Sequence, residues 1–318
     1  MIETEELKEK RKMESEKNKV KEIIKEYGML AEPKQIYSTA WDIENKYVIK
    51  KYENLTELKR NIEIITILSQ ENIPVPSIVK TLEGTEYVSD KNEYWIMTTK
   101  LKGNNIVGIK DCNDDWFYNM GMILARLHKA FDKCEDKINY WNNSLLGEME
   151  SWVSENISKE EIDYLKFWDM QESIDDLRKV YEELPKGLIH RDVHLGNFLF
   201  DNNEFSGYID FDLSQKNIRI FDLCYFMLGL LLEEEENRIG DDVWFEFLKY
   251  FVEGYHSEIP LSQVERESIE IVMENIELLF VGYFMGEQDE KAARDSAKLY
   301  YFCRGNREKI RRAVDARY

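Results

Sequence analysis

Residues 187–212 read GLIHRDVHLGNFLFDNNEFSGYIDFD, which is the most informative stretch of the chain. A short apolar strand at 188–189 leads into His190-Arg191-Asp192, and Asn197 follows five residues after the aspartate. Two apolar arms, FLF and FSGYI, then flank the strong turn sequence Asp201-Asn202-Asn203. The stretch therefore predicts a strand, a polar loop and a β-hairpin, in that order.

The predicted hairpin has a chemical consequence. Because its arms are similar in length, we expect its open ends to lie side by side, with Asn197 at one end and Asp210 at the other. A carboxamide oxygen and a carboxylate are ligands that suit Mg²⁺. Asp192 lies one short loop away, where a carboxylate can orient an incoming hydroxyl and accept its proton. The pattern predicts a magnesium site beside a general base.

The motif HRDxxxxN followed by Asp-Phe resembles the protein-kinase-like superfamily. The version in this chain is more similar to the aminoglycoside phosphotransferase and choline kinase-like family, over roughly residues 25–290. The resemblance implies an α+β, two-lobed protein-kinase-like fold. Residues 1–100 would form a small nucleotide-binding lobe with an antiparallel sheet, and residues 101–318 a larger, mainly helical lobe for catalysis and substrate binding.

The same resemblance implies roles for five residues of the opening stretch. Asp192 would be the catalytic base, and His190 would support its loop. Asn197 and Asp210 would hold Mg²⁺, while Asp212 would assist a second metal or face the substrate. The implied co-substrate is ATP or GTP.

The spacing after the hairpin separates two subclasses of kinase. Only eleven residues lie between Asp210 and Asp222, and the chain then enters the apolar helix predicted at 223–232. A protein kinase needs a long activation segment at this place to dock a peptide. The spacing therefore favours a small-molecule acceptor. By resemblance Asp222 braces the catalytic loop, and the residue type also suits a helix N-cap.

The nucleotide side is predicted from Tyr47-Val48-Ile49-Lys50, which resembles the kinase V-A-I-K strand. Lys50 would bind the phosphates, and Glu63 on the next predicted helix would pair with it. Lys51 is adjacent in sequence but would point to the opposite face of the strand.

The hinge between the lobes is predicted to follow the strand at 94–97. By resemblance Met97 guards the adenine pocket, and the main chain near Thr98 and Lys100 binds the base edge. The loop QIYSTAWDIEN before Lys50 contains no glycine. Glycines there bring main-chain donors close to phosphates in protein kinases, so the choice between ATP and GTP stays open.

Hydrophobic periodicity predicts the remaining elements. They are a charged helix over about 3–27, strands within 35–51, a helix from Asn54 or Thr56 to about Gln70, strands within 77–101, an amphipathic helix at 116–131, and helices at 241–255, 263–288 and from about 291.

Composition limits the partners. The chain has 318 residues and a net charge of −20, from 43 Lys and Arg against 63 Asp and Glu. This balance argues against nucleic acid and anionic membranes and favours a cationic acceptor, although acidity can also simply maintain solubility. The four cysteines are far apart, which predicts reduced thiols, and the N-terminus lacks the apolar core of a signal peptide. We therefore expect a cytoplasmic protein. No feature of the sequence indicates an obligate protein partner.

The acceptor is predicted to bind between the catalytic loop and the C-terminal helices. Carboxylates suit an amine-bearing acceptor and aromatics can surround a quaternary ammonium, although aromatics at helical spacing are usually core. The candidates are Asp241, Asp242, Glu274, Glu277, Glu287 and Asp289, with Trp244, Tyr283 and Phe284. The favoured acceptor is an aminoglycoside-like polyamine sugar. Choline, homoserine or another amino alcohol, a non-catalytic spore-coat-type protein, and the disfavoured protein kinase remain alternatives.

Overall fold

The computed structural model describes residues 5–106, 109, 112–134, 137, 143–158, 162–202, 204–232 and 239–315. It divides into a first unit, Met1–Asn104 with Leu199–Asp212, and a second unit, Asn105–Phe198 with Leu213–Tyr318. The boundary near residue 100 is close to the predicted one. The hairpin segment, predicted to belong to the larger lobe, is grouped with the first unit instead.

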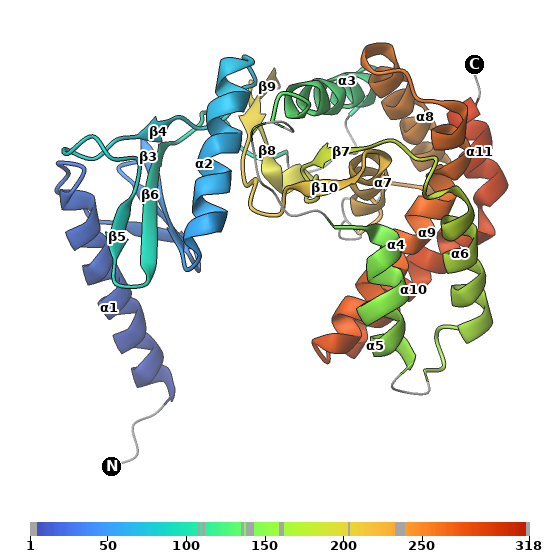
Figure 1. The fold of residues 1–318 in the computed structure, drawn as a ribbon, viewed down its shortest axis with the longest axis horizontal. Helices are drawn as coiled ribbons and strands as arrows, with labels where there is room; N and C mark the ends of the chain where they lie inside the picture. Colours follow the sequence, from blue (N-terminus) through green and yellow to red (C-terminus); the bar gives the residue numbers. More distant parts are fainter. Residues whose placement is uncertain are drawn as a thin grey trace. The chain divides into compact units, whose positions relative to one another are not determined.

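The first unit contains a six-stranded antiparallel sheet and two helices (Figure 1). The strand order is β1-β2-β3-β6-β4, and β5 pairs with β6. The elements are α1 (Glu5–Lys25), β1 (Lys34–Tyr37), β2 (Ala40–Ile43), β3 (Tyr47–Tyr52), α2 (Leu55–Gln70), β4 (Ile78–Val79), β5 (Val88–Asp90) and β6 (Glu93–Thr99). Asn54 begins α2 as its N-cap, because its side-chain oxygen accepts a hydrogen bond from the Thr56 amide at 2.8 Å.

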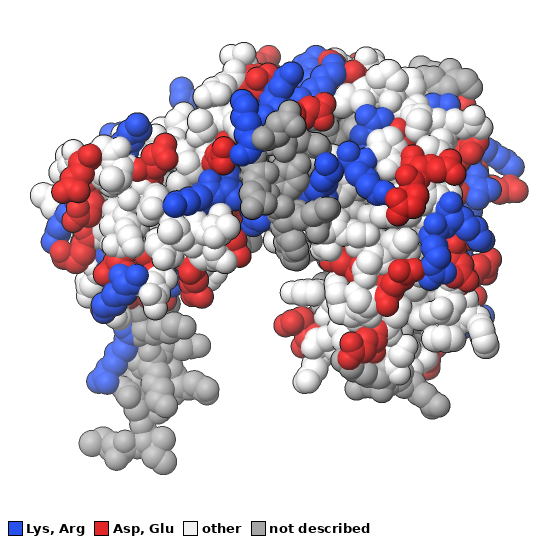
Figure 2. Space-filling model, viewed as in Figure 1, with Lys and Arg blue, Asp and Glu red and all other residues white. Residues whose placement is uncertain are grey.

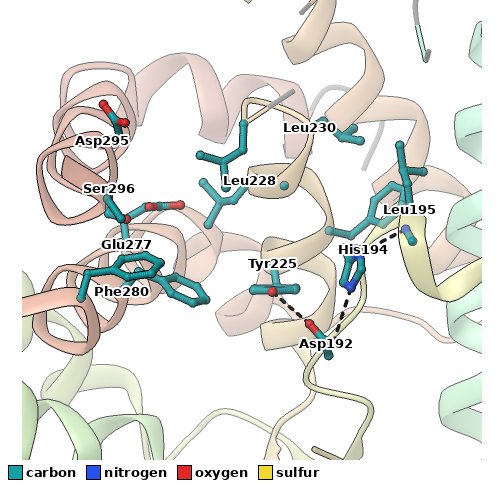
Figure 3. Close-up of a pocket in the computed structure, with 16 residues that line it drawn as sticks. Asp192, His194, Leu195, Tyr225, Leu228, Leu230, Glu277, Phe280, Asp295 and Ser296 are labelled. Atoms are coloured by element: carbon teal, nitrogen blue, oxygen red, sulfur yellow. Dashed lines mark hydrogen bonds and ion pairs between the residues drawn. The ribbon is translucent and has the colours of Figure 1, made fainter. Parts of the chain in front are cut away.

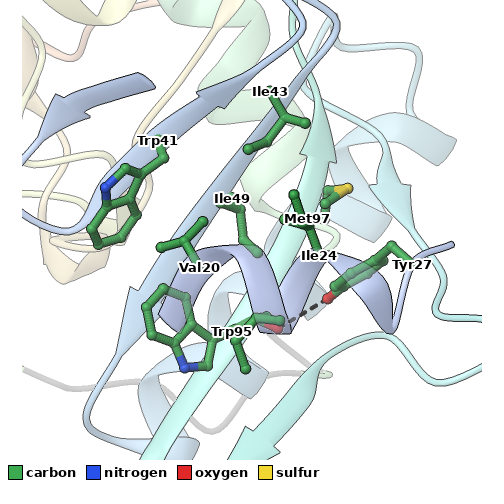
Figure 4. Close-up of a cluster of buried hydrophobic side chains, with 9 residues drawn as sticks. Val20, Ile24, Tyr27, Trp41, Ile43, Ile49, Trp95 and Met97 are labelled. Carbon is green, nitrogen blue, oxygen red and sulfur yellow. Dashed lines mark hydrogen bonds between the residues drawn. The ribbon is translucent and has the colours of Figure 1, made fainter. Parts of the chain in front are cut away.

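The two faces of this sheet carry different side chains. Strand alternation places Ile49 and its cross-strand partner Met97 on one face, where they pack with Val20 and Ile24 of α1 (Figure 4). Both of these α1 side chains are fully buried. The opposite face packs Tyr52 and its neighbours against α2. Lys50 belongs to this second face, because it lies two residues before Tyr52 on β3.

The predicted hairpin forms as β8 (Phe198–Asp201) and β9 (Glu204–Tyr208). Of its turn, Asn203 lies outside the described residues. Asn104 and Phe200 exchange main-chain hydrogen bonds of 3.0 and 2.9 Å, and Tyr208 donates to the Pro74 carbonyl at 2.9 Å. A Cβ at Gly207, whose φ is +153°, would lie 2.6 Å from the same carbonyl oxygen. These contacts explain why the hairpin is grouped with the first unit.

The second unit is mainly helical, as predicted. Its elements are α3 (Asp114–Phe131), α4 (Leu145–Glu148), a π-helical turn (Met149–Val153), α5 (Ser154–Ser158), α6 (Phe167–Val180), β7 (Lys186–Ile189), a 3₁₀ turn (Leu195–Asn197), β10 (Gln215–Ile218), α7 (Ile220–Gly229), α8 (Asp241–Glu258), α9 (Gln263–Gly286), α10 (Glu290–Gly305) and α11 (Arg307–Asp315). The α9 helix packs against α6, α7, α10 and α11 and is buried along most of its length. Strands β7 and β10 pair antiparallel and carry the loop that follows β7.

The surface is acidic overall without being uniform. Figure 2 shows Lys and Arg side chains interspersed with Asp and Glu over the face drawn. Among the described helices, none combines the length and apolar character that crossing a membrane requires. All four cysteines are free thiols, and Cys134, Cys224 and Cys303 are buried.

Candidate active site

Asp222 in the first turn of α7 holds the loop that carries the predicted catalytic residues. Its buried carboxylate accepts the main-chain N–H groups of His190 and Arg191, each at 2.8 Å. His128 Nε2 lies 3.0 Å from the same carboxylate, and the other ring nitrogen of His128 lies 2.7 Å from the Tyr255 hydroxyl. A carboxylate with this many partners positions its loop firmly. This is the geometry that the predicted bracing role requires.

Arg191 adopts a left-handed backbone conformation, with φ of +68°, which is uncommon for a residue other than glycine. Its guanidinium donates to both carboxylate oxygens of Glu148, at 2.9 and 3.0 Å, and lies over the Phe221 ring. These contacts, with those of Asp222, compensate the cost of the conformation. The loop therefore presents Asp192 in one defined orientation.

The Asp192 carboxylate is surrounded by donors. Asn197 Nδ2 donates to its Oδ2 at 3.0 Å, the Tyr225 hydroxyl donates to its Oδ1 at 3.1 Å, and His194 Nε2 lies 3.5 Å from its Oδ2. Burial by itself would raise the pKa of Asp192, but His194, His190 and Tyr225 together hold this pKa below its ordinary value. The group is therefore ionised near neutral pH, as a proton acceptor must be.

His194 is a site residue that the sequence analysis missed. Its Nδ1 accepts the Gly196 amide at 3.0 Å, so Nε2 carries the proton and faces Asp192. A Cβ at position 196 would lie 2.5 Å from the His194 ring, which explains the glycine. The signal was present in the second histidine of HRDVHLGN. Tyr225 was missed because its position on an apolar helix gave no polar signal.

Asn197 and Asp210 belong to different units, so the predicted magnesium pair stays a prediction. Asn197 Nδ2 donates to the Asp192 main-chain oxygen at 2.9 Å as well as to its carboxylate, which leaves Oδ1 as the amide atom for a cation. The Asp210 carboxylate is 44% exposed. Two oxygen donors of this kind fit a hard divalent cation.

In the first unit, Lys50 lies among acidic and polar groups. Its Nζ is 3.0 Å from Asp210 Oδ1 and 2.5 Å from Asp212 Oδ2. Tyr52 donates to Asp212 at 2.7 Å, and Asn61 donates to the same carboxylate oxygen. Burial alone would lower the pKa of Lys50, but the two aspartates raise it above its ordinary value. Lys50 is therefore a stable cation, which suits a phosphate-binding role.

The predicted partner of Lys50 is wrong. Glu63 lies on the exposed side of α2, with no hydrogen bond or ion pair to any described residue. Asn61 takes the inward position, because two residues correspond to about 200° around a helix. Asp212 is engaged by Lys50, Tyr52 and Asn61, and its predicted role toward a second metal or the substrate stays a prediction. Lys51 points to the opposite face as predicted, 3.7 Å from Glu93.

The structure contradicts the role at the adenine pocket that was predicted for the Met97 side chain. Met97 is fully buried on the α1 face of the sheet, opposite to Lys50. Thr98 pairs with Val48 and shares the face of Lys50, because successive side chains of a strand alternate. The main-chain N–H of Lys100 donates to Lys46 at 2.8 Å, so this group is not available to a base edge.

The roles of Lys50 and Glu63 can be separated by mutation. Lys50→Met is expected to raise the KM for the nucleotide about 10-fold or more, because it removes a charged hydrogen bond donor. Glu63→Gln should leave this KM unchanged, because Glu63 is exposed and unpaired. Initial rates at varied nucleotide concentration measure both. A raised KM in the Glu63 variant would indicate that Glu63 pairs with Lys50 after all.

A cavity of about 600 Å³ opens beside Asp192 within the second unit (Figure 3). Side chains of α7, α9 and α10 line it together with the catalytic loop. The residues that matter most are Asp192, His194, Tyr225, Glu277, Phe280 and Phe284. Of the described residues that line this cavity, none is lysine or arginine. Its chemistry is thus aromatic and acidic.

Two of the predicted acceptor candidates, Glu277 and Phe284, line this cavity. Glu274 instead makes a buried ion pair with Arg307, and Trp244 is core, donating to a main-chain carbonyl. The other predicted acceptor candidates are exposed, namely Asp241, Asp242, Tyr283, Glu287 and Asp289.

Tyr225→Phe tests the environment of Asp192. Loss of one donor should raise the Asp192 pKa, so the acid limb of the pH profile of kcat/KM moves to higher pH. The rate near neutral pH should fall roughly fivefold. Tyr283→Phe, an exposed tyrosine of α9, is the control and should change neither quantity. An unchanged acid limb in Tyr225→Phe would contradict a base role for Asp192.

Comparison with known proteins identifies the family. A model of the phosphotransferase enzyme family matches residues 24–267. The homoserine kinase of Zymomonas mobilis subsp. mobilis is 23% identical over 252 residues, which are 74% of this chain and 72% of that protein. The homoserine kinase of Hyphomonas neptunium is 26% identical over 237 residues, which are 71% and 70% of the two chains.

Solved structures show the same fold. A microcompartment-associated aminopropanol kinase superposes with a TM-score of 0.69 at 16% identity, covering 92% of this chain and 98% of that one. The GDP complex of aminoglycoside 2'-phosphotransferase-IIIa gives a TM-score of 0.65 at 17% identity, covering 92% and 99%. The predicted α+β kinase-like fold is therefore confirmed. Because the family model spans most of the chain, this protein belongs to the phosphotransferase enzyme family and transfers phosphate to an alcohol group of a small molecule.

Proposed function

We propose that the protein is an amino-alcohol kinase, which transfers the γ-phosphate of a nucleoside triphosphate to the hydroxyl of a small amine-bearing acceptor. One observation carries the proposal: an ionised Asp192 opens onto a cavity with aromatic and acidic walls. The names of the relatives, homoserine kinase and aminopropanol kinase, support small amino alcohols. They favour this acceptor class over the aminoglycoside-like sugar that the sequence analysis preferred.

The lining of the cavity narrows the acceptor further. Homoserine carries a carboxylate as well as an amine, and a buried carboxylate without a cationic partner is costly. No described lining residue is lysine or arginine, and three lining residues, Asp192, Glu277 and Asp295, are acidic. An amino alcohol without a carboxylate therefore fits the described lining better. Homoserine remains the second candidate because of the relatives.

The proposed reaction uses few groups. Asp192 orients the acceptor hydroxyl and takes its proton as the oxygen bonds to the γ-phosphorus, while the bond to the leaving nucleoside diphosphate breaks. Lys50 is proposed to bind the nucleotide phosphates. Asn197 and Asp210 would hold Mg²⁺, which when bound neutralises phosphate charge. Positioning and charge stabilisation would supply most of the catalysis.

A substrate panel tests this function. Nucleoside diphosphate release is measured with ATP or GTP and Mg²⁺ in the presence of aminopropanol, ethanolamine, choline, homoserine or kanamycin. We expect the highest kcat/KM with an amino alcohol that lacks a carboxylate. Turnover with homoserine alone would select the second candidate, and turnover with kanamycin alone would return the acceptor to the aminoglycoside class. Turnover with none of the amino compounds would overturn the proposal.

A further inference from the structure

The α9 helix carries four buried glutamates, and only one of them has no partner among the described residues. Arginines of other elements lie 2.5 Å from three of the carboxylates, in the pairs Glu265–Arg219, Glu270–Arg311 and Glu274–Arg307. Glu277 is only 2% exposed, yet no described residue makes a hydrogen bond or an ion pair with it. Glu277 therefore differs from its neighbours on the same helix.

An unpartnered buried carboxylate is costly, because it loses its hydration without compensation. Burial raises the pKa of Glu277 to about 8. The side chain lines the cavity beside Asp192, one helical turn before Phe280 (Figure 3). Perturbed carboxylates in cavities are typical of functional sites.

We propose that Glu277 binds the primary ammonium group of the acceptor and thereby determines substrate class. This inference rests on the proposed amino-alcohol kinase function and adds the residue that recognises the amine. A primary ammonium brings three N–H donors and a charge, so it can satisfy a buried carboxylate. A quaternary ammonium has no N–H donor and would leave the carboxylate without a hydrogen bond. Phe280 and Phe284 would cover the alkyl chain.

The surroundings of Glu277 contain no competing cation that is described. The titratable side chains that line the cavity together with Glu277 are Asp192, His194, Tyr225 and Asp295, and the thiol of Cys303 lies close enough to be affected by the charge of Glu277. Arg304 on α10, the helix that packs against α9, is paired with Glu172 and Glu274 and donates to Ser173. The amine of the acceptor would therefore be the cation that completes this site.

Glu277→Gln is the direct test, and Glu267→Gln is the matched control. Both replace a glutamate of α9 with its isosteric amide, but Glu267 is exposed and bonded to Gln263. In Glu277→Gln, kcat/KM for primary amino alcohols should fall roughly 100-fold, because a buried charged pair is lost. Activity with the matching diol, in which a hydroxyl replaces the amine, should not fall. Glu267→Gln should behave as wild type with both acceptors.

Two further readouts separate the inference from a structural role. Because the folded pKa of Glu277 lies above its ordinary value, wild-type stability is lost as pH rises towards 8. The Tm of Glu277→Gln should therefore exceed that of wild type by a margin that grows from pH 5 to pH 8. Glu274→Gln breaks the ion pair with Arg307 and should lower the Tm.

The outcomes distinguish the two proposals. In one outcome, wild type binds ethanolamine in calorimetry, Glu277→Gln does not, and no amino alcohol is turned over. This outcome supports the amine site and overturns the proposed acceptor class of the kinase. Turnover of amino alcohols that Glu277→Gln retains, with unchanged preference over the diol, overturns the amine site and supports the function. An equal or better rate with choline than with ethanolamine would also overturn the primary-ammonium assignment.

Discussion

Asp192→Asn is expected to lower kcat by about 10³-fold, with little change in the KM for the nucleotide or in Tm. The asparagine oxygen can still accept the Tyr225 hydroxyl that bonds to Oδ1 in the wild type. The loop is held mainly by Asp222 through main-chain groups, so its conformation should persist. What is lost is the ionised oxygen that orients and deprotonates the acceptor hydroxyl.

Steady-state kinetics and thermal unfolding of the same preparations measure this effect. Asp201→Asn, an exposed aspartate at the end of β8, is the control and should retain wild-type kcat. A loss in Asp192→Asn of less than tenfold would show that the carboxylate is not the base. A large fall in Tm would instead indicate that the carboxylate mainly maintains the loop.

Asp222→Asn is expected to lower the free energy of unfolding by about 3 kcal/mol, more than any other variant considered. The wild-type carboxylate accepts from two main-chain amides and faces His128, and both oxygens are used. An asparagine places an NH₂ group against one of these donors, so a buried N–H loses its acceptor. The loop around Asp192 would lose its support as well, so kcat should fall even where the variant is fully folded.

Chemical denaturation measures the free energy of unfolding, and kinetics at 15 °C measure the loop effect in folded protein. Glu308→Gln, an exposed acid of α11 that pairs with Arg312, should leave both unchanged. An Asp222→Asn variant with wild-type stability and kcat would show that the hydrogen bonds to the loop have no energetic importance.

Several features of the nucleotide side could not be predicted from the sequence. The helix at α2 was predicted correctly, yet its rotation about its own axis decides that Asn61 and not Glu63 faces Lys50. Both residues border the same apolar stripe, so local periodicity does not separate them. The register of β6 against β3 similarly decides that Thr98 and not Met97 shares the face of Lys50. A one-residue error in a strand exchanges the two faces completely.

The candidate active site likewise contains some features that the sequence predicts and others that it does not. The spacing from His190 to Asp222 was enough to predict the loop, the hairpin and the acidic helix start, because these are local patterns of apolar runs and turn residues. His194 was visible in the same motif, whereas Tyr225 was not. Its hydroxyl contacts Asp192 only because α7 packs behind the loop.

Apart from α4, α5, α6 and β10, which were not predicted, the sequence alone indicated the strands and helices in order, the polar loop after β7 and the short connection that favours a small-molecule acceptor. Each of these depends on residues that are neighbours along the chain. The tertiary structure was needed to show that Asp210 and Asp212 surround Lys50, and that Glu277, unlike the other buried glutamates of α9, has no arginine beside it among the described residues. Such pairings join residues far apart in sequence, and burial sets their energies, so no local pattern encodes them.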